Sequence, residues 1–111
     1  MLTDLDKLRE HFAGDEELIS ELAEVFEVSY KDVLSRLEKA IGEDKRDEVK
    51  LEAHTMKGMV SNFFAEELRA IAFDLEANAA KLSKEELYSK VETLKEKIPP
   101  MIKEIKNAKF S

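Results

Sequence analysis

Apolar residues recur at intervals of three and four along nearly the whole chain, and nowhere do they alternate with polar residues at every second position. A spacing of three and four places apolar side chains on one face of an α-helix, whereas a half-buried strand needs a period of two. Few helix breakers interrupt the pattern: three glycines and the adjacent pair Pro99 and Pro100. The pattern therefore predicts an all-α protein.

Capping residues divide this pattern into a short first helix and four longer ones. Thr3 is expected to cap the short helix, which ends at Gly14. Asp15 is expected to cap the second helix, which runs to about Ile41 and is ended by the glycine that follows. Asp44 is expected to open the third helix.

The second half of the chain continues in the same way. A fourth helix is expected from about Ala65, and Ser83 with Glu86 forms an S-x-x-E capping box for the last helix. The apolar register continues through Pro99 and Pro100, so we expect a kink there rather than a stop. The residues expected to face inward on the last four helices are Leu18, Ile19, Leu22, Phe26, Val33, Leu37, Ile41; Val49, Ala53, Met56, Val60, Phe63; Leu68, Ile71, Ala72, Leu75, Ala79; and Leu87, Val91, Leu94, Ile98, Ile102, Ile105.

Loops of two to four residues between such helices force neighbouring helices to be antiparallel. The expected architecture is an up-down antiparallel four-helix bundle with a short extra helix at the N-terminus. A chain of 111 residues suits one domain, so residues 1–111 are expected to form a single unit.

Charge and cysteine content narrow the classes of function. The net charge is −7 and no basic stripe is present, so a nucleic-acid partner is not expected. The absence of cysteine excludes disulfides and fits a reducing compartment. No apolar run is long enough to span a bilayer. We therefore expect a cytoplasmic monomer without a membrane association.

One stretch of the third helix, from Ala53 to Gly58, stands out. Helical geometry places His54 roughly 120–140° from the centre of the apolar stripe, so the ring is expected to point outward. Lys57 and Gly58 fall one turn further along, beside the imidazole, and Ser61 lies on the same face.

Each of these residue types has a chemical use at an exposed position. An imidazole offers a neutral ring nitrogen as a nucleophile. The ammonium group of Lys57 can steady the oxygens of a transferred phosphoryl group. Gly58 costs about 1 kcal/mol in a helix interior relative to alanine, but it clears space for a second protein to approach the ring. A lone histidine on a helix is nevertheless more often structural than functional, so these residues alone do not establish a function.

The wider pattern resembles the histidine-containing phosphotransfer (HPt) domain family over nearly the whole chain. The residues that carry the resemblance are Gly14-Asp15-Glu16-Glu17-Leu18, Leu22, Phe26, Ala53-His54-Thr55-Met56-Lys57-Gly58, Leu68 and Leu75-Glu76. The resemblance implies a phosphorelay intermediate, in which Nε2 of His54 accepts a phosphoryl group from a receiver-domain aspartyl phosphate and passes it to another receiver aspartate.

The resemblance also implies what this chain lacks and what its partners supply. Members of the family are carriers without ATP-dependent kinase activity, and they bind no cofactor or metal of their own. Mg²⁺ is expected on the partner receiver domain. The partners are expected to be response-regulator receiver domains, a sensor histidine kinase, or both.

The sequence departs from the family pattern at Phe64, where a glycine usually follows the histidine helix. A glycine would serve there as a left-handed C-cap, which phenylalanine adopts only with strain. Either Asn62 ends the helix earlier or the turn differs.

Residues around His54 are candidates for partner docking. Leu51, Lys50 and Ser61 are the predicted docking residues, although Leu51 could instead pack on an adjacent helix and Lys50 could be a solvated surface lysine. Val28 also lies off its apolar stripe and could likewise be an apolar contact for a docked partner, but we favour the interpretation that the first helix covers it. His11, in the last turn of that helix, is expected to have no chemical role.

The sequence does not support other kinds of site. A di-iron bundle needs Glu-x-x-His on two helices, and neither histidine has a glutamate three residues before it. No catalytic Ser-His-Asp arrangement, P-loop or dinucleotide fingerprint is present. Two alternatives to the relay remain: a bundle that binds a receiver or kinase without carrying phosphate, and the phosphoacceptor domain of a chemotaxis-type histidine kinase.

Overall fold

The computed structural model describes residues 2–108 and contains five helices. They are α1 (Leu5–His11), α2 (Glu16–Gly42), α3 (Arg46–Ser61), α4 (Glu66–Ala77) and α5 (Lys84–Asn107). No strand occurs within this range, so the prediction of an all-α protein is confirmed.

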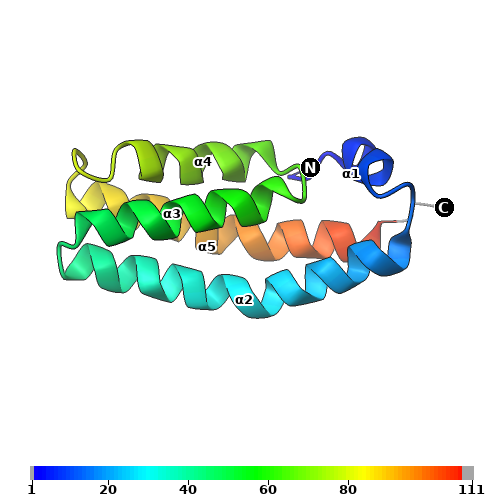
Figure 1. Ribbon diagram of the computed structural model, residues 1–111, viewed down its shortest axis with the longest axis horizontal. Coiled ribbons are helices and arrows are strands. Elements are labelled where there is room, and N and C mark those ends of the chain that lie inside the picture. The colour runs from blue at the N-terminus through cyan, green and yellow to red at the C-terminus, as the bar shows by residue number, and fades with distance from the viewer. Residues whose placement is uncertain (1, 109–111) are drawn as a thin grey trace.

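The four longer helices form an elongated up-down bundle of 46 × 21 × 19 Å (Figure 1). Helix α3 packs between α2 and α4, and α5 closes the bundle by packing against both α2 and α4. The short α1 lies beyond the turn between α3 and α4, at the end of the molecule where α2 and α5 extend furthest (Figure 1). The predicted four-helix bundle with an extra N-terminal helix is therefore confirmed.

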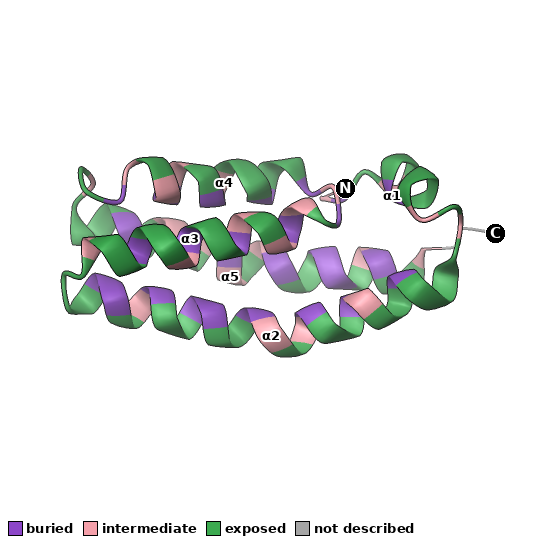
Figure 2. Cartoon of the chain, in the orientation of Figure 1, coloured by how far each residue is buried: buried purple, intermediate pink, exposed green. Residues whose placement is uncertain are grey.

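The apolar face of each long helix points into a single core, which Figure 2 shows as purple bands on the inner sides of the ribbons. On α3, Val49, Ala53, Met56 and Val60 are completely buried, as predicted. Burying a large aliphatic side chain stabilises the fold by about 1.5–3 kcal/mol relative to leaving it exposed. This inward face fixes the rotation of α3, and it thereby fixes which residues of α3 face solvent.

Two predictions for apolar residues of α2 are wrong. Leu18 was expected to face inward but is 40% exposed, because α2 begins beyond the ends of α3 and α4 and has fewer neighbours there. Val28 was expected to be covered by the first helix but is 76% exposed. Helix α1 is only seven residues long and closes the end of the bundle, where it buries Leu8.

Two predicted helix caps are confirmed. The Asp15 side chain accepts a hydrogen bond from the backbone N–H of Leu18 at 3.0 Å, and Ser83 and Glu86 form the expected capping box. Thr3 does not cap α1. Asp4, the residue directly before the helix, does so instead: its carboxylate accepts a hydrogen bond from the backbone N–H of Lys7, while Thr3 is buried.

The start of α3 differs from the prediction. Gly42 is the last residue of α2 rather than its terminator, and Asp44 is the residue in the left-handed conformation, with φ of 57°. Asp44 therefore cannot act as the N-cap. That position is held by Lys45, which makes no side-chain cap hydrogen bond.

The turn after α3 resolves the two alternatives for Phe64. The helix ends at Ser61 with Asn62 as its C-cap, and Phe64 then takes the left-handed conformation with φ of 55°. Its carbonyl accepts a hydrogen bond from the backbone N–H of Asp4 at 3.1 Å, and its ring meets His11 edge-on. Phenylalanine thus occupies a backbone geometry suited to glycine, and contacts with the α1 region hold it there.

Helix α5 continues through Pro99 and Pro100 to Asn107, so the expected continuation is confirmed, while the kink stays a prediction. Both prolines are exposed, and the carbonyl groups they leave without a helical partner can bond water. The connection between α4 and α5, residues 78–83, is longer than the expected two to four residues.

Candidate functional site

His54 lies on the outer face of α3 with 64% of its side chain exposed. The completely buried residues Ala53 and Met56 on either side of it turn the opposite face of the helix into the core. The predicted outward direction of the imidazole is therefore observed, and the ring is accessible to a second protein.

A single carboxylate on α4 joins His54 to Lys57. Nδ1 of His54 lies 2.6 Å from one oxygen of Glu76, and the ammonium group of Lys57 donates to the other oxygen at 2.6 Å. The side chains of Glu76 and Lys57 are only 15% and 20% exposed. The bridge therefore holds the two helices and the imidazole in a fixed relation.

The bridge also determines which ring nitrogen is free. An ionised carboxylate can only accept hydrogen bonds, so Nδ1 of His54 must carry a proton, and in the neutral ring this leaves Nε2 with its lone pair. The hydrogen bond from Lys57 is the main cause that lowers the pKa of Glu76, the bond from His54 adds to it, and partial burial opposes both. Glu76 is consequently an anion at neutral pH.

Glu76 was not among the predicted site residues, although Leu75-Glu76 carried part of the family resemblance. An approximate signal was present: in two antiparallel helices joined by a short turn, residues equally far from the turn face each other. His54 lies 7 residues before the end of α3 and Glu76 lies 10 residues after the start of α4, so this pair is offset from that register by about one helical turn. Lys57 and Phe73, 4 and 7 residues from the same ends, are offset in the same way. The Lys57 ammonium lies 5.4 Å from the centre of the Phe73 ring.

The structure brings Lys57 beside His54, but through Glu76 rather than directly. Ser61 donates its hydroxyl proton to the backbone carbonyl of Lys57 at 2.6 Å, so this hydroxyl is engaged within its own helix. The roles predicted for these two residues, phosphoryl stabilisation and docking, stay predictions.

Gly58 has no packing role within the described part of the chain. A Cβ atom built at this position would meet nothing within 4 Å. The glycine therefore leaves open space next to His54 at a cost of about 1 kcal/mol in helix stability.

The other two predicted docking residues are also accessible. Leu51 is 61% exposed, so the interpretation that it packs on an adjacent helix is wrong. Lys50 is exposed and forms no ion pair with any residue from 2 to 108.

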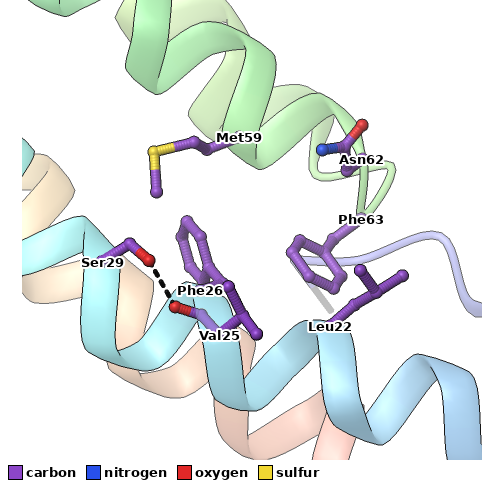
Figure 3. A pocket seen from close by; sticks show the side chains of 7 residues that line it. All are labelled: Leu22, Val25, Phe26, Ser29, Met59, Asn62 and Phe63. Atoms are coloured by element: carbon purple, nitrogen blue, oxygen red, sulfur yellow. Dashed lines mark hydrogen bonds between the residues drawn. The ribbon is translucent and has the colours of Figure 1, made fainter.

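A shallow apolar hollow of about 130 Å³ lies between α2 and the C-terminal end of α3 (Figure 3). Its lining residues are Leu22, Val25, Phe26, Ser29, Met59, Asn62 and Phe63. His54 is not among them, and no polar group converges on a point where a small substrate would react. We assign no chemistry to this hollow.

Within residues 2–108, no group of three or more histidine, aspartate or glutamate side chains is arranged to hold a metal ion. None of the helices in that part of the chain is both long and apolar enough to cross a bilayer.

An exposed histidine, fixed through one ring nitrogen on the surface of a four-helix bundle, defines a domain that presents an imidazole to other proteins. The model of the Hpt domain family matches residues 21–108, from α2 to the end of α5, including His54 and Glu76. The chain belongs to the histidine-containing phosphotransfer domain family. No curated protein and no solved structure matches it. Domains of this family are phosphotransfer carriers rather than kinases, and they interact with receiver domains and histidine kinases in two-component systems.

Proposed function

We propose that His54 is the phosphoacceptor of a phosphorelay, receiving a phosphoryl group from one receiver domain and passing it to another. The observation that supports this most directly is the hydrogen bond between Nδ1 and Glu76. In the neutral ring it leaves Nε2 unprotonated on a side chain that is mostly exposed, which is the state in which an imidazole is a nucleophile.

In the forward step, the Nε2 lone pair attacks the phosphorus atom of an aspartyl phosphate on the partner. The N–P bond forms, the P–O bond to the aspartate breaks, and the electron pair leaves with the aspartate carboxylate. Nδ1 keeps its proton, and the positive charge that develops on the ring faces the Glu76 carboxylate 2.6 Å away. Transfer to the next receiver is the reverse reaction on a different aspartate.

The neighbouring residues then have distinct proposed roles. Glu76 orients the imidazole and stabilises its charge, while Lys57 holds Glu76 in place and is close enough to the ring to contribute charge to a bound phosphoryl group. Gly58 gives the partner access to the ring, and Leu51, Lys50 and Ser61 lie where the partner docks. We expect the Mg²⁺ that assists the transfer to be bound by the receiver.

We expect the exchange to involve a monomer in the cytoplasm, in keeping with the cysteine-free sequence. A pure interaction module is disfavoured because it has no need of an acceptor whose tautomer is fixed. In the acceptor domain of a chemotaxis-type kinase, His54 would have the same role with a kinase domain as donor.

The test is to incubate the wild-type chain with radiolabelled, phosphorylated receivers of its host, and with ATP and its histidine kinases, and to measure acid-labile label. We expect wild type to be labelled, His54→Gln to be unlabelled, and the control His11→Gln to behave as wild type. A wild-type chain that takes label from no donor would refute the proposal. Labelling that survives His54→Gln would refute the site.

A further inference from the structure

Phe73 is an exposed aromatic residue beside the proposed acceptor. It lies on α4 and is 50% exposed, an unfavourable setting for a phenyl ring on an isolated domain. Aromatic side chains are enriched among the residues that contribute most to protein interfaces.

The ring is held in a defined place. The Lys57 ammonium lies 5.4 Å from the ring centre, and that ammonium is itself bonded to Glu76 at 2.6 Å. A cation over an aromatic face is attracted by the ring quadrupole. Phe73 is therefore presented to solvent in a preorganised position, which lowers the entropy lost when a partner packs against it.

The surroundings of Phe73 suit a partner that approaches His54. Gly58, on the facing helix, leaves open space where a side chain would otherwise stand. A partner must bring its reacting group to Nε2 of His54, and a standard interface covers about 800 Å² on each side. Phe73 lies within such a footprint because it contacts Lys57, one helical turn from the histidine.

Charge indicates the chemistry of that partner. Lys50 on α3 and Arg69 on α4 are exposed cations on either side of the site, and neither forms an ion pair with any residue from 2 to 108. Arg69 is one turn from Phe73 on the same face of α4. This edge therefore offers two exposed cations that can pair with carboxylates of an acidic partner.

We propose that Phe73 is an anchor for the docked receiver domain, packing against an apolar side chain at the rim of the receiver's acidic phosphorylation pocket. This inference rests on the proposed function, and it adds a docking residue on α4 to those expected on α3. Phe73 acts on recognition of the partner and takes no part in the reaction at Nε2.

The experiment compares two phosphoryl donors on each variant. One donor is a host receiver domain that exchanges phosphoryl groups with wild type, and the other is phosphoramidate, which is too small to dock. Phe73→Ala should lower kcat/KM for transfer from the receiver by about tenfold or more, mainly through KM, and leave the rate with phosphoramidate unchanged. Phe73→Leu should retain most of the receiver rate because it keeps an apolar contact.

The matched control is Tyr88→Ala, which removes a partly exposed aromatic ring from α5, where Tyr88 donates to the Glu38 carbonyl of α2. It should transfer as wild type does, and thermal unfolding should show that all variants fold. If Phe73→Ala accepts phosphoryl groups from the receiver at the wild-type rate, the inference about Phe73 is overturned, while the proposed function of His54 is unaffected. An equal loss of rate with both donors would also overturn it, since the Phe73 ring would then act on His54 itself. A change in the oligomeric state of Phe73→Ala would overturn it too. A wild type that exchanges with no receiver would overturn both this inference and the proposed function.

Discussion

Replacing Glu76 by glutamine isolates the effect of the charge on the carboxylate that bridges His54 and Lys57. The amide keeps the shape of the side chain and one oxygen that can accept the Nδ1–H, but it has no negative charge. A hydrogen bond to a charged group contributes about 1.5–3 kcal/mol, against about 0.5–1.5 kcal/mol for a neutral pair. The difference of about 1–2 kcal/mol should appear in the transition state, where the ring becomes cationic.

That difference corresponds to a rate of phosphoryl transfer about 5–30-fold lower in Glu76→Gln than in wild type. The assay is single-turnover transfer from a phosphorylated receiver, repeated with phosphoramidate, and both donors should show the loss because it resides in the imidazole. Nitrogen NMR of the ring should show the proton on Nδ1 in wild type and a mixture of tautomers in the variant.

Asp74→Asn provides the control on the same helix, because it removes a carboxylate that pairs with Lys90 and not with His54. It should leave the transfer rate unchanged. A Glu76→Gln variant that transfers as fast as wild type, or a wild-type ring protonated on Nε2, would refute the reasoning.

Comparing wild type with Glu76→Gln also predicts how the stability contributed by Glu76 changes with pH. The pKa of Glu76 is lowered below its ordinary value of 4.5, mainly by the hydrogen bond from Lys57. The stability that the carboxylate contributes is therefore complete above about pH 4.5 and is lost as the pH falls through the lowered pKa. Urea unfolding should show wild type to be more stable than Glu76→Gln at neutral pH, with the gap closing in acid. A gap that widens in acid would contradict this assignment.

Two further substitutions test local features of the site and its turn. Gly58→Ala should raise the free energy of unfolding by up to about 1 kcal/mol, since nothing obstructs the added Cβ, whereas Gly58→Leu should slow transfer from a receiver without slowing the phosphoramidate reaction. Receiver transfer at the wild-type rate in Gly58→Leu would show that steric access is not its role. Phe64→Gly should be more stable than Phe64→Ala by about 0.5–1 kcal/mol, because relief of a left-handed strain of about 1–2 kcal/mol exceeds the entropic cost of glycine. Asn62, whose backbone is right-handed, is the control: there the alanine variant should be more stable to urea than the glycine variant. If glycine is the more stable residue at both positions, or alanine at both, the strain assigned to Phe64 is contradicted.

The fold was largely predictable because apolar spacing alone defines the inward face of a helix. The inward faces of α3 and α5 were predicted almost completely, and the outward position of His54 followed from them. The errors on α2 have a common origin. Spacing shows which face is apolar, but the exposure of Leu18 and Val28 depends on where neighbouring helices end.

Helix boundaries were harder to predict because several residues compete to form each cap. Thr3 and Asp4 are both good caps, and the choice depends on the burial of Thr3, which is a property of the whole fold. The conflict at Phe64 was visible in the sequence, since a glycine was expected there, and the structure shows that the backbone keeps the glycine-like geometry.

The candidate site was predicted only in part because the sequence motif lies on one helix while the geometry uses two. His54, Lys57 and Gly58 could be predicted from their spacing on α3. Glu76 and Phe73 required the pairing of α3 with α4, which connects residues on opposite sides of a turn. Nothing in the sequence around His54 indicates that a partly buried carboxylate or an exposed aromatic ring will face this motif from α4.

The bridge from α3 through Glu76 to α4 makes the reactivity of the acceptor depend on tertiary structure. An isolated α3 peptide would contain His54 and Lys57 but would have no carboxylate to set the tautomer, so its imidazole would react as an ordinary histidine. Chemical phosphorylation of the ring is therefore also a reporter of folding, because it measures whether α3 and α4 are docked. Partial unfolding that separates these two helices would switch off the acceptor before the rest of the bundle is lost.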